Sequence, residues 1–103
     1  MISKTPNPPY YAAIFTSIRT DGDNGYGSMA DKMVHLSQMQ AGFLGMESVR
    51  DSNGFGITIS YWETLESITN WKQNIEHREA QNLGKEKWYK QFKVRICKVE
   101  RDY

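Results

Sequence analysis

The chain contains a single cysteine, Cys97, and no hydrophobic run close to the length of a membrane helix. One cysteine excludes a disulfide within the chain, which is typical of a reducing cytoplasm. A helix that spans a bilayer needs about 20 apolar residues, and no stretch approaches that length. The segment MISKTPNPPYY (1–11) carries all three prolines and lacks the apolar core of a signal peptide. We therefore expect a cytoplasmic protein without a membrane partner.

The sequence also lacks an excess of charge and the residue patterns of metal and phosphate sites. It carries 13 basic and 12 acidic residues, for a formal net charge of +1. Because the two signs are mixed along the chain, no basic stripe is available for nucleic acid. There are no paired cysteines or closely spaced histidines, and the glycine-rich segment DGDNGYG (21–27) lacks the lysine of a phosphate-binding loop. We expect no bound metal and no nucleic-acid partner.

Four segments predict β-strands. The 103 residues suffice for one domain, in which we assign 1–9 to an extended lead-in and 10–103 to the folded unit. Strands are predicted where β-branched and aromatic residues cluster or polarity alternates. These segments are 10–20, 43–51, 55–62 and 92–103. Between the second and third, Asn53-Gly54 supplies the positive φ angles of a tight hairpin.

Two further segments predict amphipathic helices. The first follows a predicted N-cap at Ser28 and ends at Gly42. The second follows a predicted N-cap at Thr64 and continues, whole or broken, over 74–84, and a short charged helical turn is predicted over 85–91. The apolar residues that repeat at helical spacing are Met29, Met33 and Leu36 in the first helix, and Leu65, Ile68 and Trp71 in the second.

The resulting order, βαββαβ, predicts an α+β ferredoxin-like fold, with a four-stranded antiparallel sheet and two helices on one face. Apolar residues occur on both faces of the predicted strands, so the helices leave one apolar face uncovered. Monomers rarely expose such a face. We therefore expect a homodimer in which two sheets close on each other.

The stretch from Ser60 to Lys90 holds all three tryptophans and His77, and is expected to form a wall of any small-molecule pocket. Trp71, on the inner face of its helix, could stack on a flat substrate or fill the core. His77 titrates near neutral pH and could take a phenol proton, or could make a helix-end or inter-subunit hydrogen bond. Other residues predicted to contact a substrate are Phe15, Tyr61, Trp62 and Trp88.

Several motifs together resemble the antibiotic biosynthesis monooxygenase family of the dimeric α/β-barrel superfamily. They are PNPPYY (6–11), AGFLGMES (41–48), SYWETLESITNWKQ (60–73), EHREAQNLGKEKWY (76–89) and VRICKVER (94–101). The resemblance implies a dimer of ferredoxin-like protomers that forms a barrel, with a pocket in each protomer between sheet and helices. It is strongest for small bacterial members of the family.

The resemblance also implies alternative activities. Some relatives oxidise anthrone-type aromatics without metal or flavin, and others degrade haem. The haem-degrading relatives need an Asn on the first strand, a Trp on the second helix and a His further along that helix. Trp71 matches the Trp, but Gln81 stands where the His falls most naturally, and the first strand has no Asn. We therefore predict a cofactor-independent monooxygenase that oxidises a small electron-rich aromatic or quinol. One alternative is haem binding or haem degradation. The others are a non-catalytic small-molecule-binding or stress-response dimer and a purely structural dimer.

Overall fold

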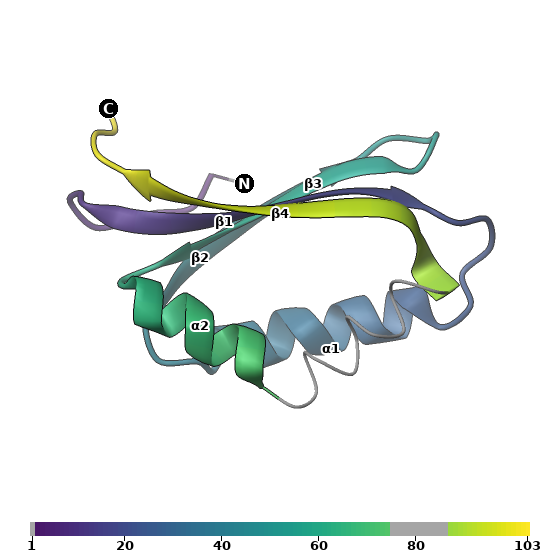
Figure 1. Cartoon of the computed structure of the whole chain (residues 1–103), viewed down its shortest axis with the longest axis horizontal. Coiled ribbons are helices and arrows are strands. Elements are labelled where there is room, and N and C mark those ends of the chain that lie inside the picture. Colours follow the sequence, from purple (N-terminus) through teal and green to yellow (C-terminus); the bar gives the residue numbers. More distant parts are fainter. Residues whose placement is uncertain (1, 75–86) are drawn as a thin grey trace.

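The computed structural model describes residues 2–74 and 87–103 and shows one antiparallel sheet with two helices on one of its faces (Figure 1). The elements follow the order β1 (Tyr10–Arg19), α1 (Tyr26–Gln38), β2 (Phe43–Arg50), β3 (Phe55–Trp62), α2 (Leu65–Gln73) and β4 (Tyr89–Val99). The strands lie side by side as β2-β3-β1-β4. This arrangement confirms the predicted βαββαβ fold. Neither described helix is long and apolar enough to cross a membrane.

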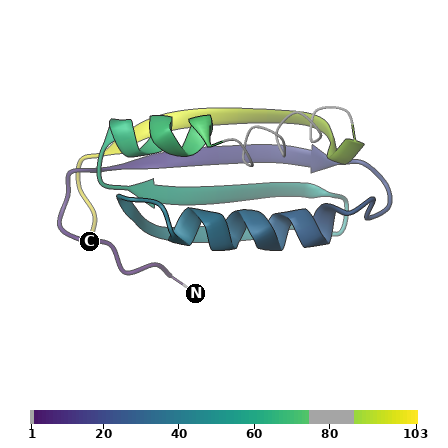
Figure 2. The same cartoon turned by 90° about the horizontal axis from the view of Figure 1, so that it is seen from below.

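The register of the sheet assigns each side chain to one face, because directly paired residues of antiparallel strands point the same way. Tyr11 pairs with Trp62 and packs on the core under the helices. Tyr11, Phe15, Thr58 and Trp62 therefore face the helices. Figure 2 shows this side, with α1 lying along β2 and α2 lying over one end of β4.

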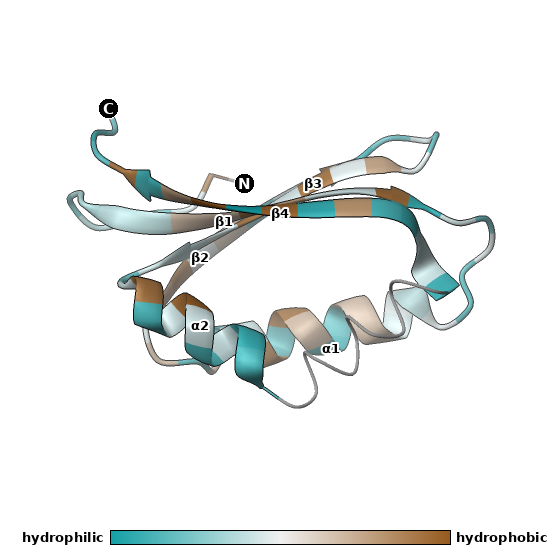
Figure 3. Cartoon of the chain, viewed as in Figure 1, coloured by the Kyte–Doolittle hydropathy of each residue, from teal (hydrophilic) through white to brown (hydrophobic). Residues whose placement is uncertain are grey.

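In the described part of the chain no helix packs on the opposite face of the sheet, and part of that face is apolar. Its exposed members include Val49, which is 72% exposed, and Phe55, which is 47% exposed. Ile57, which pairs with Val49, and Ile59 follow Phe55 on the same face of β3 and are partly buried. Figure 3 shows hydrophobic residues along strands of the sheet, in addition to those on the helices.

The helix ends follow the prediction for α2 but not for α1. Thr64 caps α2, since its hydroxyl accepts a hydrogen bond from the Ser67 N–H at 3.0 Å. The predicted cap at Ser28 is wrong, because α1 begins at Tyr26 and no side chain caps Gly25. The Asp23 carboxylate instead accepts the Gly27 N–H at 3.0 Å, which satisfies one of the free amides of the first turn.

The helix expected over 74–84, whole or broken, lies beyond Asn74 outside the described residues, whereas the limits of the last strand need correction. Helix α2 ends at Gln73, and Asn74 leaves the helical conformation with a ψ of 129°. The helical turn predicted over 85–91 is wrong from Tyr89 onward, because Tyr89 and Gln91 pair with β1. Strand β4 ends at Val99 and does not reach Tyr103.

Candidate functional site

Trp62 and Trp71 form the centre of the core under the helices. Their rings stack with centroids 6.1 Å apart, and Trp62 is fully buried while its indole N–H donates to the Ser60 hydroxyl at 2.9 Å. Trp71 is 8% exposed and packs with Ile68 of the same helix. The structure thus brings two predicted substrate-binding residues together, but both are packed mainly against the protein itself.

Beyond this stack, the helix-facing side of the sheet keeps an accessible strip that we call the sheet floor. The sheet floor comprises Phe15, Ser48, Thr58, Val94 and Ile96. Val94 and Ile96 remain 42% and 47% exposed, although they point toward the helix side. The hydroxyls of Ser48 and Thr58 lie 2.7 Å apart, and this pair is exposed. An aromatic molecule on the floor would meet an apolar surface with a few polar groups, as is typical of small-molecule sites.

Two tyrosines and two arginines gather at one end of the sheet floor. Phe15 contacts the Tyr89 ring at 5.2 Å, and the Tyr89 hydroxyl is hydrogen-bonded to Tyr26, the first residue of α1. Burial, and then this hydrogen bond, raise the pKa of Tyr89 above its ordinary value. The guanidinium of Arg19 lies 3.6 Å from the Tyr26 ring centroid, and that of Arg50 lies 5.9 Å from the Tyr89 centroid. This end of the floor is therefore aromatic and positively charged.

Trp88 lies at the same end of the sheet floor and is held there by burial and by hydrogen bonds within the chain. It is 5% exposed, and its indole N–H donates to the Asn24 carbonyl at 3.0 Å. The Trp88 carbonyl accepts from the Thr20 N–H and from Nε of Arg19. Trp88 thus ties the start of β4 to the loop before α1.

Tyr61 lies on the helix-free face, away from the other predicted site residues. Its hydroxyl donates to the Glu47 carboxylate at 2.6 Å, and the Ser3 N–H donates to the second Glu47 oxygen at 2.9 Å. These two hydrogen bonds lower the pKa of Glu47. Burial, reinforced by the Glu47 hydrogen bond, raises the pKa of Tyr61 to about 12.

The raised pKa of Tyr61 predicts a loss of stability at alkaline pH. An unfolded tyrosine ionises near pH 10 and the folded Tyr61 only near pH 12, so its contribution is complete below pH 10 and declines as the pH rises toward 12. In urea titrations, Tyr61→Phe should therefore lose less stability than the wild type over this interval. Tyr103→Phe is the control, because Tyr103 is fully exposed. Identical pH dependences of wild type and Tyr61→Phe would contradict the assignment.

Two residues that matter for the predicted chemistry lie outside the described residues. They are His77, the predicted base, and Gln81, the residue at the expected haem-ligand position. Their roles remain predictions. Within 2–74 and 87–103, no three His, Cys, Asp or Glu side chains converge as a metal site requires.

Comparison with known proteins identifies the family. A family model described as antibiotic biosynthesis monooxygenase matches residues 9–83. The chain belongs to the antibiotic biosynthesis monooxygenase family. The resemblance seen in the sequence motifs is thereby confirmed.

Individual proteins resemble this antibiotic biosynthesis monooxygenase-family protein in sequence or in fold. The uncharacterised protein YqjZ of Bacillus subtilis (strain 168) is 49% identical over 100 residues, which cover 97% of this chain and 88% of YqjZ. SnoaB of Streptomyces nogalater, a cofactor-independent oxygenase, superposes with a TM-score of 0.77 at 7% identity over 92% of this chain and 97% of SnoaB. Protein SO0527 of Shewanella oneidensis gives a TM-score of 0.79 at 7% identity over 98% of this chain and all of that chain. The two structures show the shared fold.

The sequence reading missed the cluster of Arg19, Tyr26, Arg50 and Tyr89. Each of these residues lies at or next to the end of an element, where charged and polar residues are common. One signal was available: Arg50 shares its face of β2 with Ser48, and that face continues into the helix-covered side of β3. An arginine on the face of a sheet that packs against helices is unusual unless its guanidinium has polar partners there.

Proposed function

We propose that this protein is a cofactor-independent monooxygenase that oxidises a small electron-rich aromatic or quinol bound on the sheet floor. The observation that carries the proposal is the accessibility of Val94 and Ile96 on the side of the sheet that faces the helices, where Phe15 lies between Val94 and the Ser48–Thr58 hydroxyl pair. Membership of the monooxygenase family supports the reaction class. The cofactor-independent oxygenase SnoaB, which has the same fold, supports the absence of a cofactor.

The proposed reaction takes all its electrons from the substrate. A deprotonated phenol or quinol forms a C–O bond between an electron-rich ring carbon and one atom of O2, and protonation gives a hydroperoxide. Loss of water from the hydroperoxide leaves a carbonyl at that carbon. The substrate thus gives up two hydrogens and gains one oxygen, and the second oxygen atom leaves as water.

In this scheme the protein binds the substrate and promotes its ionisation. The sheet floor supplies the apolar surface, and the Ser48–Thr58 pair supplies hydrogen bonds to a ring oxygen. His77 is proposed as the base that takes the phenol proton, and Trp71 as part of the wall of the site.

Oxygen uptake by the purified protein tests this proposal. A panel of naphthols, quinols, anthrone and hydroxynaphthoic acids is supplied with a chelator and without reductant. We expect at least one compound to give uptake above the protein-free rate and to form a quinone or other carbonyl product. Absence of such uptake with all compounds, in a folded preparation, would reject an oxygenase for this substrate class.

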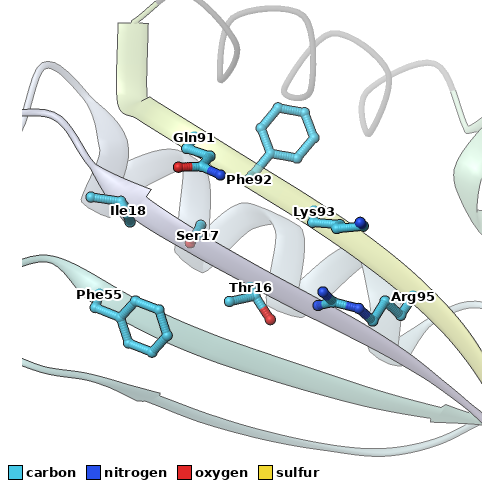
Figure 4. Close-up of a pocket in the computed structure, with 8 residues that line it drawn as sticks. All are labelled: Thr16, Ser17, Ile18, Phe55, Gln91, Phe92, Lys93 and Arg95. Atoms are coloured by element: carbon cyan, nitrogen blue, oxygen red, sulfur yellow. The ribbon is translucent and has the colours of Figure 1, made fainter.

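We further propose that two copies pair through their helix-free sheet faces. The apolar surface formed by Val49, Phe55, Ile57 and Ile59 supports this, as does a shallow cavity of about 150 Å³ on the same face. Residues that line the cavity come from β1, β3 and β4, and α1 lies behind the sheet in Figure 4.

If two copies pair in this way, a single charged side chain at the centre of the helix-free face should prevent dimer formation. Ile57→Glu should convert the dimer to a folded monomer, because a carboxylate would be buried without a partner in the interface but solvated in the monomer. Analytical ultracentrifugation measures the assembly, and circular dichroism checks the fold. The control is Val34→Glu, on an exposed position of α1, which should remain dimeric. A monomeric wild type, or a dimer that tolerates Ile57→Glu, would contradict the model.

A further inference from the structure

The guanidinium of Arg50 packs closely over the backbone of Gly56 at one end of the sheet floor. A Cβ added at Gly56 would be only 2.7 Å from the guanidinium carbon. Any larger residue at position 56 would therefore displace the guanidinium. Arg50 pairs with Gly56 across β2 and β3, one step along the same face from the Ser48–Thr58 pair. The Arg50 guanidinium thus adjoins the surface on which we place the substrate.

The hydrogen bonds of Arg50 use only part of its donor capacity. Nη2 donates to the Ser17 hydroxyl at 2.7 Å, and Nη1 contacts the carbonyls of Ser17 and Gly54 at 3.4 and 2.5 Å. A guanidinium has five N–H groups. In the part of the chain that the structure describes, no partner occurs for the Nε–H and the second Nη2–H. The Nε and Nη2 atoms together form one edge of the guanidinium plane.

The surroundings of the Arg50 guanidinium are positive and aromatic. In the described ranges no carboxylate is bonded to Arg50 or to Arg19, whose own donors point to the carbonyls of Gly22, Asp23 and Trp88. The Tyr89 ring lies 5.9 Å from the Arg50 guanidinium carbon and the Tyr26 ring lies 6.0 Å from it. Arg50 is partly buried, so its attraction for an anion is less screened than at an open surface.

We propose that the Nε–Nη2 edge of Arg50 binds a carboxylate on the substrate, and that the substrate is therefore a hydroxylated aromatic acid. Two parallel N–H groups on one edge match the two oxygens of a carboxylate, which makes this pairing strong and directional. The aromatic part of the ligand then lies along the sheet floor toward Phe15 and Thr58. This inference rests on the proposed function for the aromatic part of the ligand, and on Arg50 for the acid group.

Equilibrium binding without turnover tests the inference. The probes are 3-hydroxy-2-naphthoate and its neutral analogue 3-hydroxy-2-naphthamide, titrated under argon by calorimetry. We expect the acid to bind the wild type at least about tenfold more tightly, since a charge-assisted hydrogen bond of this kind contributes a factor of that size or more. Arg50→Met should abolish the preference, and Arg50→Lys should restore only part of it, because an ammonium lacks the flat fork.

Each outcome decides the inference separately from the oxygenase proposal. The control Arg95→Met removes a charge from the helix-free face and should keep the full preference. Equal affinities in the wild type, or an unchanged preference in Arg50→Met, would overturn the carboxylate site. Loss of both ligands in Arg50→Met would also overturn it, since Arg50 would then only hold the fold. A retained preference without any oxygen uptake would support the site while rejecting the oxygenase.

Discussion

Replacing Trp62 with alanine is expected to lower the free energy of unfolding by about 3–5 kcal/mol, the range found for buried tryptophans. Trp62 is fully buried, stacks on Trp71 and meets the Phe43 ring edge-on at 5.4 Å. Its loss would open a cavity between β3 and α2, and it would also leave Ser60 without its indole partner. Because a small domain has only about 5–15 kcal/mol of stability, this loss is a large fraction of the total.

Urea titrations at one fixed protein concentration measure this effect, since the stability of an oligomer depends on concentration. Tyr103→Ala is the control for loss of an aromatic side chain, because Tyr103 is fully exposed and should change stability little. A loss below about 1 kcal/mol in Trp62→Ala would show that the stacked tryptophans are not the centre of the core.

Replacing Val94 with tryptophan is expected to reduce the kcat/KM of the proposed oxidation by about 100-fold, with little effect on stability. Val94 is 42% exposed and pairs with Phe15 on the sheet floor. An indole ring at this position would occupy the surface on which the substrate lies, and a displacement of about 1 Å can already cost that factor in rate. Because Val94 is partly exposed, enlarging it need not displace the buried core.

Val34→Trp provides the matched control. Val34 is 37% exposed on α1, so the same residue is enlarged at a similar exposure but away from the floor. Initial rates of oxygen uptake and urea titrations are measured for both variants. Equal activity of the two would place the substrate somewhere other than the sheet floor.

Local sequence signals were sufficient for the elements that depend on nearby residues. Asn53-Gly54 predicted the hairpin, and Thr64 predicted the start of α2, because a turn and a cap are each formed within a few residues. The limits of β4 were wrong for the opposite reason. Tyr89 is strand because it pairs with Arg19, 70 positions earlier in the chain, and nothing near Tyr89 specifies that partner.

The candidate site could be predicted only in part, because residue type does not reveal which neighbours a side chain meets. Aromatic content drew attention to Trp62, Trp71 and Trp88, and the structure explains all three largely by packing and hydrogen bonds within the chain. The accessible character of Val94 depends on how far α2 covers the sheet. The position of the Arg50 guanidinium depends on Gly56, a glycine on the neighbouring strand β3. Neither property can be read from a single segment.

The fate of labelled oxygen tests the proposed cofactor-independent oxidation most directly. Metal-free protein is incubated with 18O2, a chelator and the best substrate of the aromatic panel, and the product is analysed by mass spectrometry. We expect one labelled oxygen atom in each product molecule and one O2 consumed per product, without an added reductant. A product without label, or oxidation that begins only when a metal ion, flavin or haem is added, would contradict the proposal.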